Sequence, residues 1–304
     1  MSDAPAPPQR EFVLTLSCPD RPGIVRAVAT YLHESGGNIL DSQQYADRIA
    51  DRFFMRVHVE MQGGNGPGPA PDGLAPSGPP ALRAGFGPVA SEFGMDWELH
   101  DLAIRPRVLI MVSREGHCLN DLLYRRGAEA LGIDIPLVVG NHPDLGPLAT
   151  AHGVPFEHVP AGSDALAREE GEGRLLDLID SRRIDFVVLA RYMRILSPAI
   201  CAKLAGRIIN IHHSFLPSFR GARPHQQAHE HGVKLIGATA HYVTAELDEG
   251  PIIEQEVARV DHRSSPAELA AIGRDTERIA LARAVRWHAE HRILLHGRRT
   301  VIFR

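Results

Sequence analysis

The stretch Arg207-Ile-Ile-Asn-Ile-His-His-Ser-Phe-Leu-Pro-Ser-Phe-Arg220 carries an apolar strand directly into a cluster of polar residues. Residues 207–211 are rich in β-branched side chains, as in a buried parallel strand, and Pro217 ends regular pairing soon after. Asn210 and His212 stand two positions apart, so their side chains leave the same face of an extended chain. Because open α/β sheets bind ligands at the carboxyl ends of their strands, the stretch predicts a functional site there.

A carboxylate from a second segment completes the candidate centre. Asp248 follows a strand-like run that begins at Gly237, and a second run begins at Pro251, so the sequence predicts a loop position for Asp248. A carboxylate near His212 would orient its ring, favour its charged form and relay protons. Asp248 is therefore the predicted third catalytic residue, whereas its neighbour Glu249 is interpreted as a solvated loop charge.

Composition bounds the class of protein. The 304 residues are 44% hydrophobic, enough for a large core and two domains. The 33 basic and 37 acidic residues are interspersed, which excludes nucleic acid and anionic membranes as bulk partners. The three cysteines show no CxxC spacing, and the N-terminus lacks the pattern of a signal peptide. No apolar stretch is long enough to span a bilayer, so a cytoplasmic location is predicted.

The N-terminal third predicts a βαββαβ order. Residues 1–9 are expected to be a disordered tail, and the Gly/Pro-rich insert 62–80 a flexible loop. Between them, the pattern predicts a strand from Glu11, a helix capped by Asp20 with Pro22 in its first turn, and two strands over 39–45 and 53–61. A helix over 81–93 and a strand over 95–100 would complete this domain, which is assigned to residues 10–102.

The remainder predicts a mostly parallel, doubly wound α/β sheet. Short apolar runs over 108–112, 137–140 and 186–189 alternate with helices over 117–127, 144–152 and 163–181, as in right-handed βαβ units. The chain then continues through a short helix at 223–231, strands at 235–243 and 252–260, a long helix at 265–288 and a terminal strand at 300–303. We place a hinge at 103–106 and the second domain at 107–304.

The loop after the first of these strands excludes one class of enzyme. Residues 113–120, Ser-Arg-Glu-Gly-His-Cys-Leu-Asn, contain a single glycine, so neither a dinucleotide fingerprint nor a P-loop is present. An NAD enzyme is thus a poor interpretation.

Four histidines raise the question of a metal. His225 and His229 stand four apart on a predicted helix, and His231 and His241 follow. No HExxH motif is present, and 17 histidines produce such spacings by chance. No metal site is predicted.

The N-terminal domain resembles an ACT domain, through Asp20-Arg-Pro-Gly-Ile-Val25, Gly36-Gly-Asn-Ile39 and the paired strands that follow. The resemblance implies a ferredoxin-like fold that senses a small amino acid, commonly across a subunit interface, and hence a homo-oligomer. The effector site would be lined by Asp20, Gly23 and Asn38. In the alternative interpretation Gly23 and Asn38 are only turn residues.

Residues 107–304 resemble the folate-dependent formyltransferase family. Three motifs carry the likeness: Asn210-Ile-His212 with Ser214 to Pro217, Leu247-Asp-Glu-Gly-Pro251, and Tyr192-Met-Arg-Ile-Leu-Ser197. The resemblance implies that Asn210, His212 and Asp248 are the catalytic residues. It also implies that folate is the substrate and that the reaction needs no cofactor and no metal. It implies that folate binds to Met193, Arg194, Ile195, Leu196, Thr244, Ala245 and Glu246.

The two domains together resemble the members of that family that hydrolyse 10-formyltetrahydrofolate to tetrahydrofolate and formate, which supplies one-carbon and purine metabolism. His213 stands where transferases of glycinamide ribonucleotide usually carry proline, and residues 113–120 lack their glycine-rich segment around a phosphorylated acceptor. Two alternatives stay open: a formyltransferase that uses an amine acceptor, and a non-catalytic regulator that senses an amino acid or folate.

Overall fold

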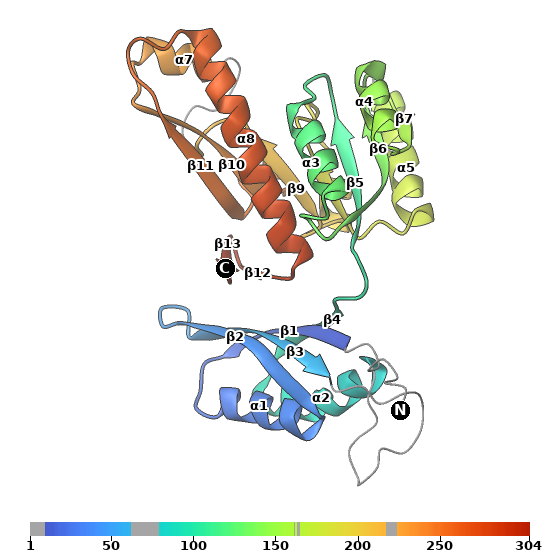
Figure 1. Cartoon of the computed structure of the whole chain (residues 1–304), viewed down its shortest axis with the longest axis vertical. Helices are drawn as coiled ribbons and strands as arrows, with labels where there is room; N and C mark the ends of the chain where they lie inside the picture. The colour runs from blue at the N-terminus through green and yellow to red at the C-terminus, as the bar shows by residue number, and fades with distance from the viewer. Residues whose placement is uncertain (1–9, 62–78, 161, 163–164, 217–223) are drawn as a thin grey trace, which may run out of the picture. The chain divides into compact units, whose positions relative to one another are not determined.

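A computed structural model describes residues 10–61, 79–160, 162, 165–216 and 224–304. The predicted tail 1–9, nearly all of the predicted insert 62–80, and Pro217 lie outside the described residues. The chain divides into two compact units (Figure 1). The first comprises residues 1–104 with His291–Leu294 and Val301–Arg304, and the second comprises Arg105–Glu290 with Leu295–Thr300. The hinge at 103–106 and the two domain ranges read from the sequence stay a proposal.

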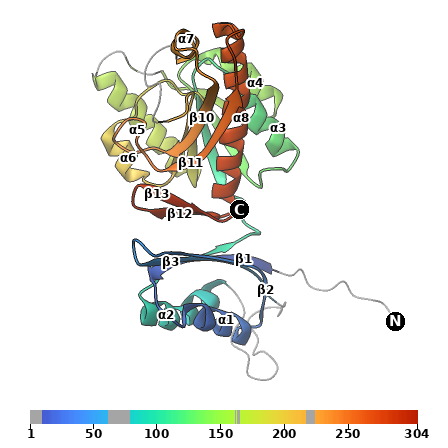
Figure 2. The ribbon, with the colours of Figure 1, turned by 90° about the vertical axis from the view of Figure 1, so that its left-hand side faces the viewer.

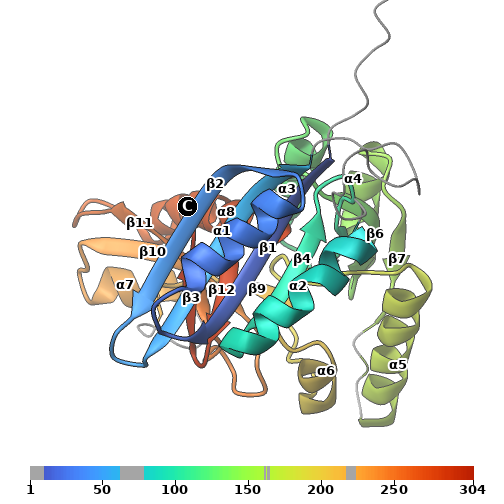
Figure 3. The ribbon, with the colours of Figure 1, turned by 90° about the horizontal axis from the view of Figure 1, so that it is seen from below.

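The first unit is a four-stranded sheet covered on one face by two helices (Figure 3). Its elements are β1 (Arg10–Pro19), α1 (Ile24–Glu34), β2 (Gly37–Asp47), β3 (Arg52–Met61), α2 (Pro79–Phe93) and β4 (Asp96–Asp101). The sheet order is β2-β3-β1-β4, and all its strands pair antiparallel. Alternate residues of β1, such as Leu14 and Leu16, pack in one core with Val28 of α1 and Phe86 of α2. The predicted βαββαβ order is confirmed.

The start of α1 differs from the prediction. The helix begins at Ile24 after Gly23, which has a φ of 100° and takes the cap position, so Asp20 does not cap the helix and Pro22 precedes it. A left-handed backbone of this kind suits glycine, because a Cβ makes it strained. The chain therefore turns into the helix through the conformational freedom of Gly23 rather than through a side-chain cap.

The second unit is a seven-stranded sheet with helices on both faces. Its helices and sheet strands are β5 (Arg107–Val112), α3 (His117–Gly127), β6 (Asp134–Gly140), a 3-10 turn (Pro143–Leu145), α4 (Gly146–Ala151), β7 (Phe156–His158), α5 (Ala165–Ser181), β8 (Phe186–Leu189), α6 (Pro198–Lys203), β9 (Ile208–His212), α7 (Pro224–Glu230), β10 (Leu235–Tyr242), β11 (Ile252–Arg259) and α8 (Pro266–Ala289). Figure 2 shows α5 and α6 on one side of the sheet and α3 and α8 on the other. Two further strands, β12 (Ile293–His296) and β13 (Arg299–Ile302), pair with each other in a separate sheet.

The strand order of this sheet is β11-β10-β9-β8-β5-β6-β7. The five strands from β9 to β7 run parallel, while β10 and β11 are antiparallel to their neighbours. The chain moves outward from β5 through β6 to β7 and then returns to the opposite side of β5 as β8. This reversal opens a crevice at the carboxyl ends of the parallel strands, where open sheets of this class hold their ligands. Within the described residues, no helix has both the length and the apolar character needed to cross a membrane.

Candidate active site

Asn210 and His212 lie at the carboxyl end of β9, in the middle of the sheet. Asn210 pairs with Leu189 of β8 on one side and with His241 of β10 on the other. His212 is 6% exposed, and Ile209 and Ile211 between and beside them are buried in the sheet. Because strand residues alternate between faces, the buried isoleucines anchor β9 while the amide and the imidazole share the opposite face.

Asp248 reaches the same point from the loop between β10 and β11. One of its carboxylate oxygens, Oδ2, lies 3.3 Å from Nδ1 of His212, and the other, Oδ1, lies 3.7 Å from Nε2 of His241. Asp248 has a φ of 55°, a left-handed conformation that is uncommon outside glycine and found at functional sites. The carboxylate, the imidazole and the amide predicted from two distant segments therefore meet in one place.

His241 lies at the candidate site, although the sequence analysis did not assign it there. It stands directly opposite Asn210 across the antiparallel pair, and its Nε2 lies 3.2 Å from Nδ2 of Asn210. Its Nδ1 lies 2.9 Å from the carbonyl oxygen of Tyr242, which can only accept, so Nδ1 carries the proton. Burial lowers the pKa of His241, which favours the neutral ring. Nε2 is then an acceptor, and it holds the Asn210 amide with its nitrogen toward the site.

The electrostatics favour an ionised carboxylate at the centre. The hydrogen bond with His212 lowers the pKa of Asp248, and the charge of His212 acts in the same direction. Nδ1 of His212 faces this carboxylate, whereas its Nε2 is buried and makes no hydrogen bond with the described residues. The ring of His212 is thus oriented from one side and available to a ligand from the other.

A cavity of about 260 Å³, here called the site cavity, brings the remaining predicted residues to this centre. Its walls include Asn210, His212 and Asp248 together with the two segments predicted to bind folate, Met193–Leu196 and Thr244–Glu246. A second cavity of about 540 Å³ is lined by the same segment, Tyr192–Leu196, and by residues of α5. The hydroxyl of Ser113, just after β5, accepts a hydrogen bond of 2.9 Å from the backbone N–H of Met193 and fixes this shared wall.

The predicted effector residues lie in the first unit. Asp20 follows β1 and donates its backbone N–H to the carbonyl of Asp51, Gly23 precedes α1, and Asn38 lies in β2. The role of these three residues in binding an effector stays a prediction.

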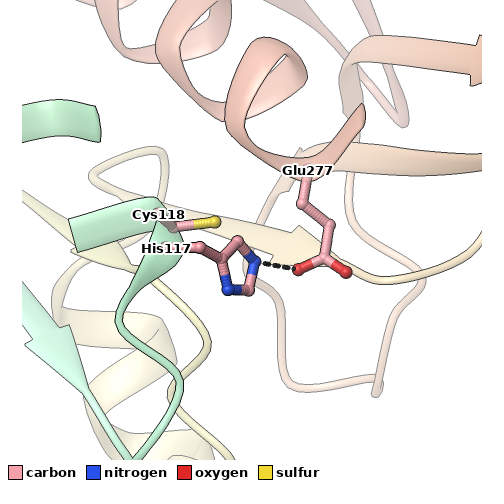
Figure 4. A group of neighbouring side chains, drawn as sticks. All are labelled: His117, Cys118 and Glu277. Carbon is pink, nitrogen blue, oxygen red and sulfur yellow. Dashed lines mark hydrogen bonds and ion pairs between the residues drawn. The ribbon is translucent and has the colours of Figure 1, made fainter. Parts of the chain in front are cut away.

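The structure groups a different set of potential metal ligands from the histidines considered in the sequence. Among the described residues, the one group of three potential ligands is His117, Cys118 and Glu277, none of them from the histidine set considered in the sequence (Figure 4). Nε2 of His117 is hydrogen-bonded to Glu277 at 2.8 Å, and burial raises the pKa of the Cys118 thiol well above its usual range. Arg191 lies 3.4 Å from the same carboxylate. A neutral thiol, an occupied imidazole and an adjacent cation fit a hydrogen-bonded ion pair better than a metal ion.

His213 yields a prediction for acid stability. Its ring stacks on that of His212 with centroids 5.0 Å apart, and burial, followed by the charges of Arg191 and His212, lowers its pKa from 6.5 to about 4. The unfolded chain therefore binds this proton more readily, so the stability that His213 contributes is complete above pH 6.5 and is lost as the pH falls toward 4.

Between pH 6.5 and pH 4, we expect the free energy of unfolding of His213→Gln to fall less than that of the parent. The difference between the two losses is at most about 3 kcal/mol. Urea unfolding at a series of pH values measures the difference. The prediction would be contradicted if the free energies of unfolding of parent and variant fell in parallel as the pH is lowered.

Gly250 yields a prediction for the Asp248 loop. A Cβ at this position would overlap the carbonyl oxygen of Tyr242 in β10, and backbone cannot yield as a flexible side chain can. Gly250→Ala is therefore expected to destabilise the protein by roughly 1–3 kcal/mol and, by shifting Asp248, to lower activity about tenfold or more. Thermal unfolding and steady-state enzyme activity measure the two effects. Gly173→Ala in α5 is the control, because its Cβ meets open space and alanine favours a helix. Equal behaviour of the two variants would show that the loop does not depend on Gly250.

Comparison with known proteins identifies the family. Residues 106–285 match the model of the formyl transferase family, and residues 12–66 match that of the ACT domain. A formyltetrahydrofolate deformylase from Corynebacterium sp. (strain P-1) is 49% identical, over 97% of this chain and 99% of the relative. The crystal structure of formyltetrahydrofolate deformylase from Burkholderia mallei ATCC 23344 is 48% identical with a TM-score of 0.88, covering 97% of this chain and 100% of that one.

A more distantly related structure is similar to only part of this chain. Glycinamide ribonucleotide transformylase 1 from Symbiobacterium toebii is 30% identical with a TM-score of 0.61, and it covers 66% of this chain and 95% of its own. The deformylases match nearly the whole chain, whereas the transformylase matches only part of it. The chain belongs to the formyltetrahydrofolate deformylase family.

Proposed function

We propose that this enzyme hydrolyses 10-formyltetrahydrofolate to tetrahydrofolate and formate through Asn210, His212 and Asp248. The observation that carries the mechanism is the meeting of these three side chains on the wall of one cavity, with the Asp248 carboxylate 3.3 Å from the His212 ring. The reaction breaks an amide-like C–N bond, so the formyl carbonyl must be polarised before water can add to its carbon.

In this mechanism, the amide of Asn210 and the imidazole of His212 polarise the formyl carbonyl. Asn210 donates an N–H to the formyl oxygen, with its amide nitrogen kept toward the site by His241. His212, whose Nε2 makes no hydrogen bond with the described residues, stabilises the negative charge that develops on that oxygen when water attacks. His241 touches no reacting atom in this scheme and is a positioning residue.

In this mechanism, the carboxylate of Asp248 transfers the proton. Asp248 holds His212 in place, orients the attacking water and takes a proton from it. When the tetrahedral intermediate collapses, Asp248 returns that proton toward the departing nitrogen, and the C–N bond breaks to leave the amine of tetrahydrofolate and formic acid. The formic acid keeps the second hydrogen of the water as its hydroxyl proton and releases it to solvent as it becomes formate. Solvent is the only nucleophile that the reaction requires.

The pterin of the substrate would lie against Met193–Leu196 and the loop Thr244–Asp248. The proposal is supported by the shared wall of these segments in the site cavity, which joins the catalytic side chains to apolar groups and backbone.

Formate release in the absence of any acceptor tests the function. Purified enzyme is incubated with 10-formyltetrahydrofolate alone, and formate is measured by a coupled formate dehydrogenase assay. Stoichiometric formate and tetrahydrofolate are expected. Tetrahydrofolate that forms only when an amine is added, with a formylated amine instead of formate as the second product, would indicate a transferase. Tight folate binding without turnover would indicate a regulator.

We extend the proposal to regulation. A small amino acid would bind at the ACT domain near Asp20, Gly23 and Asn38, across an interface between subunits of a homo-oligomer, and the enzyme would work in the cytoplasm. The ACT match over residues 12–66 supports the ligand-binding part of this proposal. Calorimetric titration with small amino acids, together with light scattering for the subunit number, tests it.

A further inference from the structure

Arg191 is a buried cation in the wall of the site cavity that the mechanism does not use. It follows β8 directly, lines the cavity together with Asn210, His212 and Asp248, and has a φ of 62°. Its side chain is only 16% exposed. A charged residue in a left-handed conformation at this edge is held there at some cost in backbone strain, which is a mark of functional positions.

A buried carboxylate holds the guanidinium in place. Glu277 of α8 is 2% exposed, and its Oε2 lies 3.4 Å from Nε of Arg191 and 2.8 Å from Nε2 of His117 at the start of α3. Burial raises the pKa of Glu277, but the hydrogen bond from His117 and the charge of Arg191 outweigh burial and leave the pKa below its ordinary value. The carboxylate is therefore ionised, and Figure 4 shows how it joins α8 to α3.

The guanidinium is paired but not saturated. One oxygen of Glu277 is shared between His117 and Arg191, and Nε and Nη1 of Arg191 make no hydrogen bond with the residues that the structure describes. These two nitrogens are buried, which leaves Nη2 as the guanidinium nitrogen that can face the cavity. An arginine whose Nη2 can face a cavity is suited to binding a small carboxylate or similar anion there.

The proposed reaction generates such an anion in the same cavity. The product takes one oxygen from the formyl group and one from water, and it becomes the formate carboxylate when its remaining hydroxyl proton leaves after the C–N bond breaks. It then lies next to the ionised Asp248, which repels it. A cation on the same wall would accept the charge as it leaves the catalytic centre.

We propose that Arg191 is the anion-binding residue for the formate product. The subsite takes small monocarboxylates and rests on the proposed deformylase activity. Glu277 and His117 are positioning residues, because they hold the guanidinium without touching the anion. Formate is therefore expected to inhibit the enzyme as a product, through its charge.

The first test uses the unmodified enzyme. Initial rates are measured with sodium formate, with formamide, which is similar in size but neutral, and with sodium chloride at equal ionic strength. Formate should inhibit at concentrations at least about tenfold lower than formamide or chloride. Equal inhibition by formate and formamide would overturn the subsite.

The second test removes the cation. Arg191→Gln should raise the inhibition constant of formate about tenfold or more, and Arg191→Lys, which keeps the charge, should restore part of the affinity. Arg183→Gln is the matched control, since Arg183 is an exposed arginine with a φ of 51° that does not line the cavity. The KM for 10-formyltetrahydrofolate reports whether the folate site is intact in each variant.

The two proposals fail in distinguishable ways. Parent enzyme that releases no formate from 10-formyltetrahydrofolate would refute the deformylase mechanism. Active parent enzyme whose formate inhibition is the same in the Arg191→Gln variant would refute the formate subsite alone.

Discussion

Replacing Asn210 with alanine is expected to lower kcat about 100- to 1000-fold and to leave folate affinity nearly unchanged. The amide donates to an oxygen whose charge grows only as water attacks, so its loss raises the energy of the transition state more than that of the bound substrate. Its fixed orientation by His241 at 3.2 Å adds to the effect, because the donor needs no reorganisation during the reaction.

Steady-state formate release gives kcat for this variant, and calorimetric titration with tetrahydrofolate gives the affinity. Asn120→Ala, at an exposed position of α3, is the matched control and should retain parental kinetics. An Asn210→Ala enzyme that hydrolyses at the parental rate would remove Asn210 from the mechanism.

Replacing Asp248 with asparagine is expected to lower kcat by about 100- to 10,000-fold. The substitution keeps the shape of the side chain but removes the charge that faces Nδ1 of His212 at 3.3 Å and the base that accepts a proton from water. Because the hydrogen bond with His212 lowers the pKa of Asp248, the carboxylate is ionised throughout the neutral range, and its protonation limits activity only at a pH below its ordinary pKa of 3.8.

The pH profile of kcat/KM, together with kcat at neutral pH, measures this effect. Glu249→Gln removes the adjacent carboxylate, which pairs with Arg298 at 2.9 Å instead of the site, and should behave as the parent. The charge of Asp248 would have no specific role in catalysis if Asp248→Asn kept most of the activity, or if the two variants lost equal activity.

Local patterns predicted the parts of the site that lie within one strand or one motif. The two-residue spacing of Asn210 and His212 put both side chains on one face, and the continuous apolar run before them predicted a central strand. Asp248 could be assigned to a loop because Pro251 and the strand-like runs bracket it. These inferences use the periodicity of the backbone, which a sequence displays directly.

Residues that join the site through tertiary pairing could not be found in this way. His241 faces Asn210 only because β10 runs antiparallel to β9 in one register, and a shift of one residue would turn it to the other face. The sequence showed His241 only as one of several histidines. Likewise, Arg191 lies after β8, Glu277 in α8 and His117 at the start of α3, and no local pattern shows that these segments converge.

The same contrast holds for the fold. The strands β5 and β8 were predictable because they are continuous apolar runs, and the helix at His117–Gly127 was predictable because its 11 residues are enough to show a helical period. Three short elements, β7, α6 and β12, were missed because three to six residues show no clear period. For α6 a signal was present, since Ser197 caps the helix and Pro198 opens it.

Isotope transfer from water tests the central claim most directly. The enzyme is incubated in H₂¹⁸O with 10-formyltetrahydrofolate and no amine, and the formate released in the first turnovers is analysed by mass spectrometry. Attack by water predicts one ¹⁸O atom in each formate, with an equal amount of tetrahydrofolate. Unlabelled formate, or no formate without an amine and a formylated amine once one is added, would contradict a hydrolase centred on Asn210, His212 and Asp248.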